Sequence, residues 1–131
     1  MAQLEPAIVE HLLDDSNVTA LIGDRLYPVR ITQNVQPPCV AYRKIDVLTD
    51  HAYRTANGLS GTRIRFDCFA KSVKESKTIA EKLVTSLDGL IDTILGVAIH
   101  GTLYLDEFDG YNDEAKLFVV SVDFRFWHNN A

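Results

Sequence analysis

The sequence predicts an α+β fold: a four-stranded, mainly antiparallel sheet with one main helix packed on one face and a short N-terminal helix. Two segments, 62–70 and 117–127, alternate apolar and polar residues with a period of two, which is typical of strands that bury one face. Between them, segment 73–90 repeats apolar residues at helical spacing. Hairpins on both sides of a central helix favour this class over a doubly wound sheet, and a length of 131 residues favours one domain, residues 1–131.

The two clearest strands each separate an apolar face from a charged one. The apolar positions are Ile64, Phe66 and Cys68 in the first strand and Phe118, Val120, Val122, Phe124 and Phe126 in the second. The polar positions on the opposite faces are Arg63, Arg65, Asp67, Ser121, Asp123 and Arg125. We expect the apolar face to pack on the core and the charged face to meet water or a partner of similar chemistry. Function should therefore reside on the charged face or in the loops around it.

Helices precede and separate these strands. Residues 4–13 predict a short amphipathic helix, and Asn17 can cap a second short turn over 18–22. Ser72 and Glu75 form a capping-box pattern at the start of the main helix. We expect this helix to cover the apolar face of the sheet, with four side chains buried together: Phe66, Leu83, Leu87 and Phe124.

The rest of the chain predicts two more strands and two loops. The apolar alternation shifts by one position in the middle of 40–48, so this strand requires a bulge. The gap 49–61 lacks an apolar pattern and holds two glycine turn dipeptides, which predicts a long hairpin with a mobile tip. A strand at 102–108 and a polar loop at 109–116 lead into the last strand.

Composition and charge exclude several classes of protein. The net charge is −5, whereas nucleic-acid binders cluster Lys and Arg to displace counterions, so no specific nucleic-acid binding is expected. No apolar run approaches the roughly 20 residues of a membrane helix, and the N-terminus does not resemble a signal peptide. We therefore expect no membrane partner and synthesis in a cytoplasm, where Cys39 and Cys68 stay buried, reduced thiols rather than a disulfide.

The sequence shows no pattern that is typical of catalysis, metal binding or a cofactor. The four histidines lack metal-ligand neighbours, and the acid-rich run 106–114 misplaces the glycine and final glutamate of an EF-hand loop. Phosphate-binding glycine motifs and a nucleophile elbow are missing from the sequence. The sequence thus predicts no catalytic residue, no metal and no cofactor in a protein that is not an enzyme. Two alternatives stay open: a small α+β module that binds a ligand or peptide as a monomer or dimer, and an enzyme whose site is assembled from distant residues.

Four stretches, in order, carry a family resemblance. They are the opening helix followed by Val-Thr-Ala-Leu-Ile-Gly-Asp-Arg-Leu-Tyr-Pro at 18–28, Gln-Pro-Pro-Cys-Val-Ala-Tyr at 36–42, Arg-Ile-Arg-Phe-Asp-Cys-Phe-Ala at 63–70 running into the capped helix, and Val-Asp-Phe-Arg-Phe-Trp at 122–127. Together they resemble the tail-completion or tail-terminator proteins of long-tailed bacteriophages, a family once described as the domain of unknown function DUF3168.

The resemblance implies a structural protein that forms a ring, commonly a hexamer, on the finished tail tube. Such a ring stops tube growth and joins the tail to the head. The implied partners are further copies of itself, the major tail tube protein and a head-completion or connector protein. The implied location is the virion tail of a phage or prophage, after assembly in the bacterial host cytoplasm.

A ring subunit needs two different, complementary patches, because a heterologous interface closes by rotation. The acidic stretch 106–114 and the basic region of Arg54, Arg63 and Arg65 are the candidates for opposite partners. The full set of candidate partner-interface residues is Asp50, His51, Tyr53, Arg54, Arg63, Arg65, Asp109 and Tyr111.

Overall fold

The computed structural model describes residues 3–31, 36–49 and 59–129. These residues form three helices and six strands, which confirms the α+β class. In chain order the elements are α1 (Leu4–Leu13), α2 (Ser16–Ile22), β1 (Leu26–Pro28), β2 (Cys39–Thr49), β3 (Leu59–Ala70), α3 (Val73–Leu87), β4 (Asp92–Ile94), β5 (Val97–Asn112) and β6 (Leu117–Asn129).

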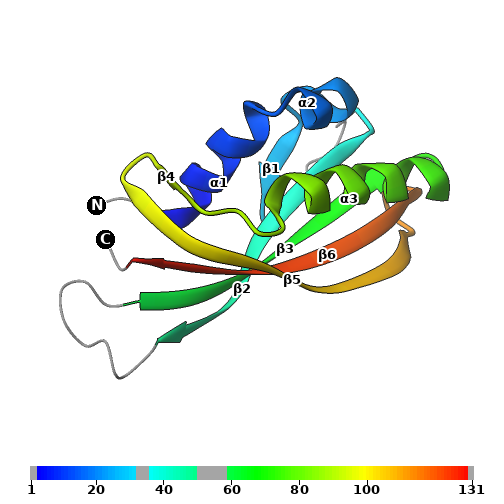
Figure 1. Cartoon of the computed structure of the whole chain (residues 1–131). Coiled ribbons are helices and arrows are strands. Elements are labelled where there is room, and N and C mark those ends of the chain that lie inside the picture. The colour runs from blue at the N-terminus through cyan, green and yellow to red at the C-terminus, as the bar shows by residue number, and fades with distance from the viewer. Residues whose placement is uncertain (1–2, 32–35, 50–58, 130–131) are drawn as a thin grey trace.

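All six strands belong to one curled sheet with the strand order β1-β2-β3-β6-β5-β4 (Figure 1). Neighbouring strands are antiparallel except for β1 and β2, which are parallel. The prediction of four strands is wrong, because β1 and β4 complete the sheet at its two edges. Each of these strands has three residues, which is too short to display the alternation by which a strand is recognised in a sequence.

The main core lies between the sheet and the helices, which Figure 1 shows on the same side of the sheet. Phe66, Leu83, Leu87 and Phe124 are all buried in this core, as predicted. The rings of Phe66 and Phe124 meet edge to face, with their centroids 5.8 Å apart. Helix α1 contributes Leu4, Ile8 and Leu12 to the same core, so the short helices also help to cover the sheet.

Helix α3 begins as predicted and ends earlier than predicted. The Ser72 hydroxyl accepts a hydrogen bond from the Glu75 N–H at 3.2 Å and so caps the first turn. The helix stops at Leu87 rather than near residue 90: the backbone is already extended at Asp88, with φ −63° and ψ 125°, and Gly89, with a φ of +79°, then turns the chain toward β5. The Gly89 N–H then donates to the carbonyl of Thr102 at 2.9 Å. The cap of α2 also differs from the prediction: Asp15, not Asn17, is the capping residue.

The predicted bulge in β2 is confirmed. The register with β3 shifts between Lys44 and Asp46. Ile45 is therefore the extra residue, and Val47 pairs with Thr62 on the same face of the sheet as Tyr42.

Strand β5 is much longer than the predicted 102–108, and the predicted loop at 109–116 is wrong. Residues through Asn112 stay paired with β6, so only the short turn 113–116 connects the two strands. The Asp109-Gly110 dipeptide suggested a turn, but this part of β5 is exposed and can carry polar residues without leaving the sheet. Two bulges, after Ile99 and after Tyr104, keep the long pairing in register. Strand β3 likewise begins at Leu59, earlier than expected.

Both cysteines are buried, as predicted. Cys39 belongs to a small apolar cluster with Ala41, Phe69 and Leu117, on the face of the sheet away from the main core. Cys68 lies in the main core, so the two thiols project from opposite faces of adjacent strands and cannot form a disulfide without backbone movement. Burial raises the pKa of Cys39 to about 11 and that of Cys68 well above its ordinary value.

Candidate partner-binding surfaces

The face of the sheet opposite the helices, the helix-free face, is organised around the buried carboxylate of Asp123. Arg63 donates to Oδ2 from Nε at 2.9 Å and from Nη2 at 2.5 Å. Arg65 donates to Oδ1 from Nε at 2.8 Å and to Oδ2 from Nη2 at 3.0 Å. Four charge-assisted hydrogen bonds thus join two guanidinium groups of β3 to one carboxylate of β6.

The strand register explains why the charges pair in this way. Arg65 lies directly opposite Asp123, whereas Arg63 lies opposite Arg125, a like-charge pair that would be destabilising on its own. Arg63 therefore leans toward Asp123, and Arg125 reaches the carboxylate of Asp46 on β2. Every arginine of this group has a carboxylate partner, so the charges of the helix-free face largely satisfy one another.

The electrostatics of Asp123 follow from two opposing effects. Burial disfavours its charged form, but hydrogen bonds from Arg65 and Arg63 outweigh burial and hold the pKa of Asp123 below its ordinary value. Hydrogen bonding to Asp123 also raises the pKa of Arg65. The guanidinium of Arg65 further lies over the ring of Phe108, 4.7 Å from its centroid. The charged network therefore stiffens the contact between β3, β6 and β5.

The structure separates the predicted interface residues into two faces. Arg63 and Arg65 lie on the helix-free face, and their side chains retain 25% and 22% of their exposure. Asp109 and Tyr111 lie on the helix side of β5, where Asp109 forms an ion pair with Lys77 of α3 at 3.4 Å. Tyr111 is half exposed and packs its ring on Phe118, with the centroids 5.1 Å apart. The remaining candidates lie outside the described residues: Asp50, His51, Tyr53 and Arg54.

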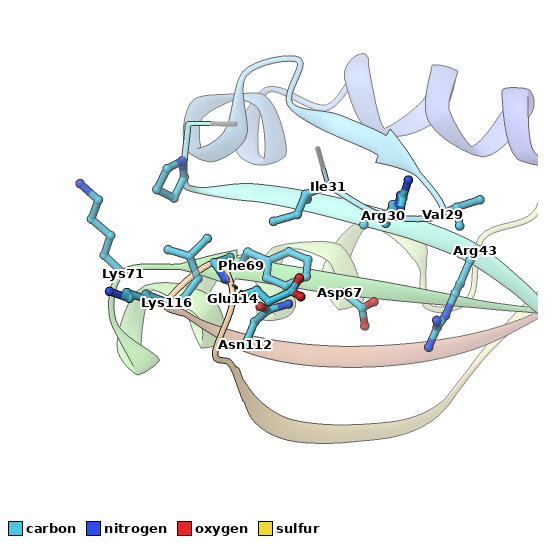
Figure 2. Close-up of a pocket in the computed structure, with 14 residues that line it drawn as sticks. Val29, Arg30, Ile31, Arg43, Asp67, Phe69, Lys71, Asn112, Glu114 and Lys116 are labelled. Atoms are coloured by element: carbon cyan, nitrogen blue, oxygen red, sulfur yellow. Dashed lines mark hydrogen bonds between the residues drawn. The ribbon is translucent and has the colours of Figure 1, made fainter. Parts of the chain in front are cut away.

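An open groove of about 1280 Å³ lies on the helix-free face, between the segment that follows β1 and the turn that joins β5 to β6 (Figure 2). Its apolar lining includes Ala41, Phe69 and Leu117. Its charged lining is Arg30, Arg43, Lys71 and Lys116 together with Asp67 and Glu114. Four cations against two carboxylates give the groove a positive balance, in contrast to the net charge of −5 of the whole chain.

The groove was not predicted from the sequence. Its walls come from residues near 30, 70 and 115, and only the strand order brings them together. In Figure 2, Lys71 and Lys116 lie at one end and Arg43 at the other, with Asp67 between them. The Asp67 carboxylate already accepts a hydrogen bond from the Ser121 hydroxyl at 2.6 Å. Such a lining can hold acidic side chains of a partner. Among the described residues, the lining includes no histidine or cysteine.

Within the described residues, no group of three His, Cys, Asp or Glu side chains is arranged to hold a metal ion. Two of the four histidines make polar contacts with other segments of the chain instead. His11 lies with Nε2 3.1 Å from the carbonyl oxygen of Ser86, and the Nε2 of His128 lies 2.7 Å from the hydroxyl of Thr62. No helix in the part of the chain that the structure describes is long and apolar enough to cross a membrane.

Comparison with known proteins gives a family and a fold. A family model described as "Tail completion protein gp17" matches residues 6–129. The structure is similar to a chain of a particle described as "Virion of native gene transfer agent (GTA) particle", with a TM-score of 0.78 at 15% sequence identity. The similarity covers 97% of this chain and 95% of that chain, and at this identity it shows the fold alone. No curated protein sequence matches the chain.

Proposed function

The chain belongs to the family described as tail completion protein gp17, and from this membership we propose that it forms a ring on the finished tail tube of a phage or phage-like particle. A structural role in the virion tail follows from the family. The proposal adds that the ring ends polymerisation of the tail tube protein and joins the tail to the head connector. It also adds that the ring is a hexamer and that the protein has no catalytic activity.

The observation that carries this proposal is the family match over residues 6–129, which covers nearly the whole chain. The structure is compatible with a ring subunit, because a sheet braced by a buried core and by the Asp123 network gives a stiff wall. The groove on the helix-free face offers a positively charged surface for an acidic segment of the tube or connector protein.

Deletion of the gene from the phage or prophage that encodes the chain tests the proposal. We expect filled heads together with tails that are abnormally long or unjoined, visible by negative-stain electron microscopy of the lysate. Expression of the wild-type gene from a plasmid should restore joined particles of normal tail length. Tails of normal length attached to heads in the uncomplemented lysate would refute the assignment.

The groove also favours a second candidate function, a peptide-binding module that acts as a monomer or dimer. Its lining, which combines apolar side chains with an excess of positive charge, suits an acidic peptide. Under this alternative, deletion leaves tails unchanged, and the purified protein binds acidic peptides with an affinity that falls when Arg43 is replaced by glutamate. Under the ring proposal, deletion alters the tails whether or not such peptides bind.

A further inference from the structure

One edge of the sheet is left open along much of β5. Strand β4 pairs with β5 only over Val97–Ile99. The linker before β4 then forms hydrogen bonds with the backbone of Thr102 and Tyr104. The Tyr104 N–H donates to the carboxylate of Asp88 at 3.2 Å. Beyond Tyr104, no other strand of the described residues pairs with the outer side of β5 over 105–111.

The opposite edge is open along the second half of β2. Strand β1 pairs with β2 as far as Tyr42, whose carbonyl accepts a hydrogen bond from the Val29 N–H at 2.7 Å. Over 43–48 the inner side of β2 pairs with β3, and no described strand pairs with its outer side. Each open stretch is about 20 Å long at the rise of a β-strand. Exposed edges of this length act as templates for pairing with another chain.

The two open edges differ in charge. The β5 edge carries three acids and no base: Asp106, Glu107 and Asp109, the last of which forms an exposed ion pair with Lys77 of α3. The β2 edge carries Arg43 and Lys44 and one acid, Asp46, which is paired with Arg125. Lys44 also lies 3.8 Å from the carboxylate of Glu5 on α1, in an ion pair whose two side chains stay partly exposed. An acidic edge facing a basic edge is favourable, whereas pairing two β5 edges would set three carboxylates against three.

Both edges also expose large apolar side chains that a neighbour could cover. On β5 they are Leu105, Phe108 and Tyr111, each between 40% and 49% exposed, and on β2 they are Ile45, Val47 and Leu48, each between 38% and 50% exposed. Burial of such side chains is the main favourable term in most associations between proteins. The edges therefore combine unpaired backbone, complementary charge and apolar surface.

Strand direction is consistent with joining these edges in a closed ring. Each step from β2 to β3, β6 and β5 is antiparallel, so β2 and β5 run in opposite directions. A second copy placed by rotation, with its sheet continuing the first, sets its β2 antiparallel to the β5 of the first copy. This contact joins two different surfaces, so it can repeat around a ring.

We propose that the outer edge of β5 in one copy pairs with the outer edge of β2 in the next, so that the sheet continues from subunit to subunit. This inference rests on the proposed ring and names the surfaces that form it. The occupant of each edge is a second copy of this chain. All helices then lie on one side of the continuous sheet, and all helix-free faces lie on the other.

Charge reversal at the two edges provides the first test. Glu107→Lys and Lys44→Glu, each alone, should reduce joined particles in the complemented deletion strain about tenfold or more, because like charges then face each other. The double variant Glu107→Lys with Lys44→Glu should restore them, since every interface regains opposite charges. Matched controls on the exposed surface of α3, Glu81→Lys and Lys82→Glu, should join tails as the wild type does.

Cross-linking identifies the partner directly. Tails assembled with a chain that carries both Glu107→Cys and Lys44→Cys are treated with a short bifunctional maleimide, which tolerates a register offset of one residue. We expect a ladder at multiples of the chain mass, and no ladder from either single variant. The natural cysteines do not interfere, because Cys39 and Cys68 are fully buried.

Several outcomes would overturn the inference. A dimer from Glu107→Cys alone would indicate β5–β5 pairing, and a product of another mass would indicate a different protein at the edge. A double reversal that joins tails no better than the single variants would also overturn it, provided that circular dichroism shows all variants folded. In each of these cases an abnormal deletion lysate still supports the proposed function, whereas a normal deletion lysate overturns the function itself.

Discussion

Replacement of Asp123 by asparagine should destabilise the protein strongly, although the two side chains have nearly the same shape. Asp123 is fully buried, and its carboxylate accepts all four hydrogen bonds that join Arg63 and Arg65 to β6. The amide of asparagine loses the charge and offers one acceptor oxygen, which leaves two neighbouring guanidinium groups without a counter-charge. Removing one partner of a buried ion pair costs about 3–5 kcal/mol. We expect about 3 kcal/mol, because both arginine side chains keep access to water.

The measurement is urea denaturation of the purified chain at pH 7, followed by far-ultraviolet circular dichroism. Asp109→Asn is the matched control, since the Asp109 side chain is 57% exposed and its ion pair with Lys77 lies at the surface. The control should change the free energy of unfolding by no more than about 0.5 kcal/mol. A similarly small change for Asp123→Asn would refute the reasoning, because the carboxylate would then contribute nothing beyond its shape.

The pH dependence gives an independent check on the same residue. The folded pKa of Asp123 lies below its ordinary value, which is about 3.9 in an unfolded chain. The folded state therefore holds the proton more weakly, so the stabilisation is complete above about pH 4 and is lost as the pH falls through the folded pKa. The difference in unfolding free energy between wild type and Asp123→Asn should accordingly stay constant from pH 7 to 5 and shrink below pH 4. A difference that grows on acidification would contradict the sign of this argument.

Three further predictions follow from packing. Leu83→Ala should lower the free energy of unfolding by about 2–5 kcal/mol in urea titrations, because Leu83 is fully buried under the sheet; an unchanged midpoint would contradict the core described above. Gly61→Ala should lower the free energy of unfolding by about 1–3 kcal/mol and shift the fluorescence emission of Trp127, the only tryptophan, since a Cβ at Gly61 would lie 2.7 Å from Cζ3 of that ring. Gly101→Ala is the control, because a Cβ there meets open space; it should change neither the free energy of unfolding nor the emission of Trp127. The Cys39 thiol should resist iodoacetamide at pH 8 until urea unfolds the chain, because it is buried and its pKa is raised to about 11; mass spectrometry showing rapid native labelling would count against this.

Periodicity predicted those parts of the fold in which one face of an element is buried. The alternation in β3 and β6 and the stripe of α3 identified the core, because burial imposes a period of 2 on strands and 3.6 on helices. The same logic located the bulge of β2, since only an extra residue at Ile45 returns Val47 to the face of Tyr42. Where neither face is buried, as in 106–112 of β5, polar residues in a strand resemble a loop, and the prediction failed.

For the helix-free face, the sequence predicted which residues lie on it but not how they pair. Alternation placed Arg63, Arg65 and Asp123 on polar faces, but their pairing depends on the register of β3 with β6. That register sets Arg65 opposite Asp123 and produces an internally neutralised network, which residue types alone do not reveal. The groove was missed for a stronger reason, because its walls are far apart in sequence and meet only in the folded sheet.

The distribution of satisfied and unsatisfied groups indicates where specificity of assembly should reside. On the helix-free face, Asp123 pairs with Arg63 and Arg65, so a partner that docks there must compete with bonds already made. The open edges at 43–48 and 105–111 make no such demand, because the part of the chain that the structure describes places no strand against them. A partner strand gains backbone hydrogen bonds there, and the ion pairs that the edge side chains make, Lys44 with Glu5 and Asp109 with Lys77, lie at the exposed surface. If assembly uses these edges, substitutions in the Asp123 network should alter the stability of the subunit, whereas substitutions at the edges should alter joining of tails with little effect on stability.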